Sequence, residues 1–163
     1  MSATRLNKGL SVTNRGSAIT TNVVNLTRVI PISYSAGTSE NETAFALPAS
    51  AIVKNVYLRV KTAEATGGTK TIDVGTLSTD SGDADGFLDG VSVASTGLVK
   101  GTLASGGQTL GALLSVDESG AGVLVPEVDI ASGGKVITWT PGSNDFAELE
   151  ADIIVEYQQV LAD

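Results

Sequence analysis

The sequence contains neither cysteine nor histidine. Without cysteine, no disulfide can hold the fold, and no thiolate can act as a nucleophile or metal ligand. Without histidine, the chain lacks the commonest general base and the commonest transition-metal ligand. It also lacks a G-x-S-x-G motif and a phosphate-binding P-loop. These absences predict that the protein is not an enzyme and has no catalytic residues and no cofactor.

Aromatic residues are also scarce, at 4% of the chain, whereas hydrophobic residues make up 42%. We therefore expect a core built mainly from Val, Leu, Ile and Ala. The single Trp139 and the three tyrosines are scattered, so no aromatic platform for a sugar is evident. No apolar run approaches the ~18 residues that span a bilayer, and the N-terminus lacks an apolar signal segment. The sequence predicts a soluble single domain with no membrane partner.

Basic residues are few, and the charge along the chain is unevenly distributed. The net charge of −8 at pH 7 repels phosphate, which argues against nucleic acid as a partner. Residues 1–39 contain basic residues but no acidic one, and all 18 carboxylates lie at or after Glu40. This split predicts a basic N-terminal arm and an acidic body. The basic residues predicted to contact a partner are Arg5, Lys8, Arg15 and Arg28.

Residues 1–27 are polar and rich in Ser, Thr and Asn, and no regular period persists through them. They predict an extended arm, with a short strand around Ala18–Val24, that becomes ordered only by lying on another surface. Because the body is acidic, we expect the arm to lie on an acidic protein surface, such as that of an identical neighbour. The remaining residues, 28–163, form the predicted β domain.

Turn signals recur at intervals of roughly 8–12 residues, and no long segment has a helical period, which favours an antiparallel β-sandwich or a barrel. Pro31 predicts an edge position for its strand, because proline cannot donate to a ladder. Gly67-Gly68 predicts a hairpin between the strands on either side. Gln108–Leu114 fits a short helix and a strand about equally. The main predicted strands are Arg28–Tyr34, Ala51–Lys61, Lys70–Leu77, Lys135–Thr140 and Glu148–Leu161.

Thr79–Gly90 is an acidic, glycine-rich loop. Hard cations such as Ca²⁺ favour several carboxylates on a tightly turning backbone, and part of this loop resembles the middle of an EF-hand loop. Ser81 and Ser92, however, occupy the positions of the first and last EF-hand ligands, and the flanks are strand-like. A solvated turn is the favoured interpretation, so no metal site is predicted, and Ca²⁺ binding is the open alternative. The carboxylates concerned are Asp80, Asp83, Asp85 and Asp89.

The segment around Glu148–Tyr157 alternates polar and apolar residues. A period of two places its carboxylates on one face and its aliphatic side chains on the other. Paired carboxylates can hydrolyse glycosides, but the solvent side of a half-buried strand explains the same pattern. We therefore expect these carboxylates to face solvent. They are Glu148, Glu150, Asp152 and Glu156.

Three stretches, together with the polar arm, resemble structural proteins of tailed bacteriophages. They are the acidic turn GDADGFLDGVSVAS (Gly82–Ser95), the strand KTIDVGTL (Lys70–Leu77) and the hairpin GGKVITWTPGSNDFAELEADIIVEY (Gly133–Tyr157). The closest class is the small capsid decoration, or cement, proteins. This resemblance covers residues 28–160, and it implies an antiparallel β-sandwich that is jelly-roll-like.

The resemblance implies a homotrimer on the outer surface of the phage capsid, made in the host cytoplasm, that fastens neighbouring major capsid proteins together. Weak contacts repeated over a lattice give avidity without a deep pocket. No catalytic residue carries over from this class. Two alternatives stay open: a carbohydrate- or receptor-binding sandwich of a tail or fibre, and another virion structural component. The sequence leaves open the strand order and the symmetry of any assembly.

Overall fold

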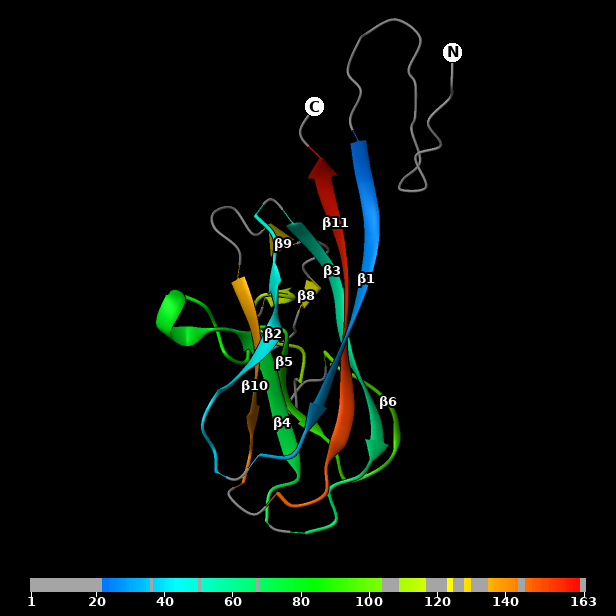
Figure 1. Cartoon of the computed structure of the whole chain (residues 1–163), viewed down its shortest axis with the longest axis vertical. Helices are drawn as coiled ribbons and strands as arrows, with labels where there is room; N and C mark the ends of the chain where they lie inside the picture. Colours follow the sequence, from blue (N-terminus) through cyan, green and yellow to red (C-terminus); the bar gives the residue numbers. More distant parts are fainter. Residues whose placement is uncertain are drawn as a thin grey trace, which may run out of the picture.

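The computed structural model describes residues 22–35, 37–49, 51–66, 68–103, 109–116, 123–124, 128–129, 135–143 and 146–161. Within these ranges the chain is all-β, apart from one turn of 3-10 helix, η1 (Ser78–Asp80). Two antiparallel sheets pack face to face (Figure 1). The predicted antiparallel β-sandwich is confirmed. No helix in the described ranges has the length and apolar character needed to cross a membrane.

The two main sheets draw their strands from distant parts of the sequence. The first sheet has the order β1 (Asn22–Ser33), β11 (Glu150–Leu161), β3 (Ala51–Thr62) and β6 (Gly97–Lys100), and β9 (Val128–Asp129) also pairs with β3. The second sheet has the order β2 (Asn41–Leu47), β10 (Lys135–Pro141), β4 (Thr71–Thr76) and β5 (Leu88–Ser92). The short strands β7 (Ser115–Val116) and β8 (Val123–Leu124) pair with each other.

This strand order is that of a jelly roll. The antiparallel partners are nested: β1 pairs with β11, β2 with β10, β3 with β6, and β4 with β5. Such nesting is what results when one long antiparallel hairpin is rolled up, so that its strands alternate between two sheets. The jelly-roll-like arrangement expected from the resemblance is therefore present. Strands β7 to β9 lie in the connection between β6 and β10.

The core lies between the two sheets and is mainly aliphatic, as the composition predicts. Alternate residues of β3 and β11 point into it, with Val56, Leu58 and Ile153 at most 1% exposed. Full burial of each such side chain stabilises the fold by roughly 1.5–3 kcal/mol. The few aromatic core residues include Phe87, Phe146 and Trp139.

Two predicted hairpins are wrong. The strands on either side of Gly67-Gly68, β3 and β4, belong to different sheets, and so do β10 and β11. Turn residues predict that the chain reverses, but they do not show whether the next strand pairs with the last one or crosses to the opposite sheet. In the segment that fitted a helix and a strand equally, Leu110 forms a single bridge to Leu88, and a turn follows at 112–114.

The edge position predicted for Pro31 is confirmed. Within the described residues, β1 pairs only with β11. The ladder continues in the hydrogen bond that the Tyr34 N–H donates to the Leu149 carbonyl, 2.8 Å away. Because donors alternate along an antiparallel strand, the nitrogen of Pro31 faces the free edge of the sheet. No ladder bond is lost there.

The predicted arm lies largely outside the described residues. Strand β1 begins at Asn22, which pairs with Leu161 of β11, so residues 22–27 are part of the first sheet. Residues 1–21 are not among those described. The division into an arm of residues 1–27 and a β domain of residues 28–163 stays a prediction.

Candidate partner-binding surface

Of the four basic residues predicted to contact a partner, the structure describes only Arg28. It is exposed on β1, and its guanidinium carbon lies 5.2 Å from the centroid of the Phe45 ring on β2. This cation–π contact links the edge strands of the two sheets. Arg5, Lys8 and Arg15 lie outside the described residues. Contact between these four residues and a partner stays a prediction.

A groove of about 430 Å³ opens along the side of the sandwich where the edge strands β1 and β2 face each other. We call it the edge groove. Ile30, Ile32, Phe45 and Trp139 contribute to its apolar lining. Tyr34, which follows β1, also lines it and is 53% exposed. Polar and charged residues such as Glu42 also line the groove, so its character is mixed. A groove of mixed lining bordered by an exposed tyrosine is suited to contact another protein.

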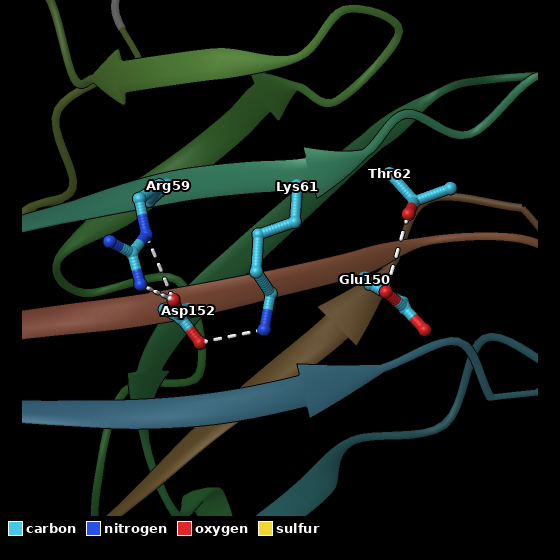
Figure 2. A network of polar contacts seen from close by, with 5 residues as sticks. All are labelled: Arg59, Lys61, Thr62, Glu150 and Asp152. Atoms are coloured by element: carbon cyan, nitrogen blue, oxygen red, sulfur yellow. Dashed lines mark hydrogen bonds and ion pairs between the residues drawn. The ribbon is translucent and has the colours of Figure 1, made fainter.

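The outer face of the first sheet carries a buried carboxylate paired with two more exposed cations (Figure 2). Asp152 of β11 is only 4% exposed, although its neighbours on this face contact solvent. Its carboxylate accepts hydrogen bonds from Arg59 Nε and Lys61 Nζ of β3, each at 3.0 Å. Burial raises the pKa of Asp152, but these two hydrogen bonds and the positive charges outweigh it, so the pKa is lowered. The expectation that Asp152 faces solvent is wrong, because two long side chains of the adjacent strand cover it.

Other carboxylates of this face also bond to the neighbouring strand. Glu156 accepts hydrogen bonds from the Tyr57 hydroxyl at 3.0 Å and from Asn55 Nδ2 at 3.4 Å. Glu150 accepts one from the Thr62 hydroxyl at 3.3 Å (Figure 2). These cross-strand contacts explain the alternating carboxylates as part of the sheet surface, rather than as a pair aimed at a substrate.

The acidic loop folds back against the outer face of the second sheet. The N–H groups of Thr76 and Gly86 donate to the Asp83 carbonyl at 2.7 and 3.2 Å. A Cβ at Gly75 would lie 1.9 Å from that carbonyl oxygen, so the strand beneath must have a glycine at this point. Thr138, beside Gly75 on β10, is fully buried. The loop is therefore a packed part of the fold.

The carboxylates of this loop act on one another. A hydrogen bond with Asp85, burial and nearby negative charge raise the pKa of Asp83 to about 6. Burial and the charge of Asp85 also raise the pKa of Asp89. Throughout the described part of the chain, no three or more carboxylates are arranged to hold a metal ion. The loop is thus a packed turn in which neighbouring carboxylates raise one another's pKa.

The sequence analysis did not predict that Glu64 is a buried carboxylate. It follows β3, is 1% exposed, and accepts five hydrogen bonds, from the N–H and hydroxyl of Thr66 and from the N–H groups of Ala147, Glu148 and Leu149. Burial raises the pKa of Glu64, but these hydrogen bonds outweigh it and lower the pKa to about 2. Glu64 therefore anchors the segment that leads into β11. In the sequence it lies in a polar stretch that is typical of a solvated loop.

Comparison with known proteins gives a likeness in fold. No family model matches the sequence, and no curated protein matches it. The fold matches a chain of the solved structure described as "Cyanophage Pam1 capsid asymmetric unit", with a TM-score of 0.52. The two chains share a fold. The likeness covers 98% of this chain and 99% of that chain, at 16% sequence identity, so it extends over the jelly roll as a whole and assigns no residue a role.

Proposed function

We propose that the chain is a structural protein of a phage particle, and specifically a capsid decoration protein. The observation that supports this is the fold likeness to a chain of the cyanophage Pam1 capsid. The likeness spans nearly the whole of both chains, so it concerns two proteins of the same extent rather than one shared module. Jelly rolls are also frequent among viral capsid proteins, although lectins and cupins share them.

The proposed role is non-catalytic. Histidine and cysteine are absent from the whole sequence. The buried carboxylates Glu64 and Asp152 are bound by backbone and side-chain groups of the fold itself. We propose that the protein acts through its surface, binding major capsid proteins on the outside of the head, and that it does so as a homotrimer. Neither nucleic acid nor a membrane is a proposed partner.

The N-terminal arm is the proposed element that grips the capsid lattice. Residues 1–21 contain Arg5, Lys8 and Arg15 and no carboxylate, so they are attracted to an acidic protein surface. Because β1 begins at Asn22, a deletion of residues 1–21 leaves every residue of the paired strand in place. We expect this truncated protein to keep its β-fold and its thermal stability but to lose binding to capsids that lack the protein.

Two measurements test the proposal. Purified full-length protein should bind expanded capsids lacking it, and antibody labelling of intact particles should decorate the surface of the head. Label on the tail or fibre instead would support the receptor-binding alternative, and a glycan array would then identify its ligand. Undiminished capsid binding after deletion of residues 1–21 would refute the role of the arm while leaving the decoration role intact.

A further inference from the structure

Strand β1 connects the proposed arm to the first sheet. It begins at Asn22, directly after residues 1–21, and each of its 12 residues pairs with a residue of β11. The pairing starts with Asn22 beside Leu161 and continues to Ser33 without a register shift. The ladders of β11 with β3 and of β10 with β2 both contain register shifts. Tension on the arm therefore enters the domain through an unbroken antiparallel ladder.

Side chains also fix β1 in its register. Val24, Ile30 and Ile32 point into the core and are at most 8% exposed. Near the start of the strand, Gln158 Nε2 of β11 donates a hydrogen bond to Asn25 Oδ1, 2.8 Å away. A slip of β1 by one residue would turn its buried side chains to the outer face of the sheet, because side chains alternate along a strand. Burial and backbone hydrogen bonds therefore both oppose sliding of β1 along β11.

The direction of a pulling force decides how this ladder breaks. The hydrogen bonds of an antiparallel pair lie perpendicular to the strands. A force along the strands stretches all of these bonds together, which is shear, whereas a force that parts the strands at one end breaks one pair after another, which is unzipping. The start of β1 and the end of β11 lie side by side at one end of the molecule, and the start of β11 lies at the opposite end (Figure 1).

We propose that the β1–β11 ladder is a shear clamp, which keeps the domain folded when the arm is pulled away from it along β1. A partner that holds the arm beyond the start of β1 pulls Asn22 along the strand axis, and the domain resists through β11. Because β11 lies between β1 and β3, the force passes to the centre of the first sheet. This inference rests on the attachment of the arm in the proposed function, and it adds how the fold resists tension on that attachment.

Single-molecule force spectroscopy on the full-length protein tests the clamp. The sequence has no cysteine, so two introduced cysteines give unique attachment points for the pulling handles. Ser2→Cys with Ala147→Cys pulls the arm against the start of β11 and loads the ladder in shear; Ala147 is exposed, so no buried side chain is replaced. Ser2→Cys with Asp163→Cys pulls the arm against the end of β11, beside Asn22, and unzips the same ladder.

The mean unfolding force should be at least about twofold higher in the shear geometry, because the hydrogen bonds of the ladder then break together. Both pairs of cysteines leave the same domain to unfold, so the difference in force reports the pulling geometry and the barrier to unfolding rather than the equilibrium stability. Equal forces in the two geometries, or a higher force in the unzipping geometry, would overturn the clamp.

A substitution in β1 tests whether this strand is the element that resists. Ile30→Ala removes buried contacts of β1 and should lower the force in the shear geometry. Val29→Ala, at the exposed neighbouring site, is the matched control and should leave the force unchanged. Circular dichroism establishes that each variant is folded, and Ile32→Ala is the substitute if Ile30→Ala fails to fold. A force that the substitution in the buried site leaves unchanged would also overturn the clamp.

The force measurement uses the isolated protein and needs no capsid. Capsid binding, measured separately on the wild type, reports on the decoration role. Failure of the clamp is therefore distinguishable from failure of the proposed function.

Discussion

Replacement of Glu64 by glutamine should destabilise the protein strongly, although the side chain keeps its size. Oε2 of Glu64 accepts three backbone N–H groups, and Oε1 accepts the N–H and hydroxyl of Thr66. An amide has only one oxygen. With that oxygen facing the three N–H groups, the NH₂ group of the introduced glutamine faces the Thr66 N–H, so two donors meet where the carboxylate supplied an acceptor.

The magnitude follows from the pKa. A carboxyl whose pKa falls from its usual 4.5 to about 2 in the folded state stabilises that state, at neutral pH, by about 3 kcal/mol. The sign follows from proton linkage. The pKa is lowered by folding, so this stabilisation is complete above pH 4.5 and is lost as the pH falls towards 2. We expect Glu64→Gln to lower the free energy of unfolding by about 2–4 kcal/mol at pH 7.

Urea denaturation at pH 7 and at pH 3 measures both the loss and its pH dependence. The difference between wild type and Glu64→Gln should be largest at pH 7. It should shrink at pH 3, because there the unfolded wild-type chain binds a proton at Glu64 that the folded protein, with its lowered pKa, does not bind. Glu148→Gln is the matched control, because its exposed side chain lies in the same segment, and it should have little effect. A loss below about 0.5 kcal/mol at pH 7, or a loss that is equal at both pH values, would refute the reasoning.

Replacement of two further carboxylates by asparagine should change the stability of the protein in opposite directions: Asp83→Asn should raise it and Asp152→Asn should lower it. Asp85 raises the pKa of Asp83 from its usual 3.8 to about 6. Ionisation of Asp83 therefore destabilises the folded protein as the pH rises from about 4 to 6. Asp83→Asn should raise the melting temperature at pH 7, and this gain should disappear near pH 4. An equal change at both pH values would contradict this. Asp152→Asn should lower the free energy of unfolding by about 1–3 kcal/mol at pH 7 in urea titrations, because the buried carboxylate loses its charge-assisted hydrogen bonds to Arg59 and Lys61. Glu150→Gln, at an exposed site on the same strand, should change it far less.

Much of the fold was predictable because strands leave local traces. The period of two in β3 and β11 predicted which side chains enter the core, and Pro31 predicted an edge because a missing N–H is tolerated only there. The pairing of the strands was harder to predict from the sequence. Gly67-Gly68 suggested a hairpin, yet β3 and β4 lie in different sheets, since a reversal of the chain does not reveal which strand comes to lie beside it.

Local sequence patterns also failed to predict the environments of the buried carboxylates. Alternation placed Asp152 on the outer face of its strand, but its burial depends on Arg59 and Lys61, which come from a strand far away in the sequence. Glu64 gave little local signal, because only Thr66 is near it in the sequence and its three other donors are the N–H groups of residues 147–149. Such environments arise only when distant segments are brought together, and no pattern in neighbouring residues encodes them.

The sequence by itself determined that the protein is an all-β sandwich with an aliphatic core and a basic start ahead of an acidic body, because composition, turn residues and alternation act locally. Only the tertiary structure decided the nested strand order, the edge groove and the burial of Asp152 and Glu64. Those features depend on which strands lie side by side. That arrangement is chosen by the packing of the whole core rather than by any one segment.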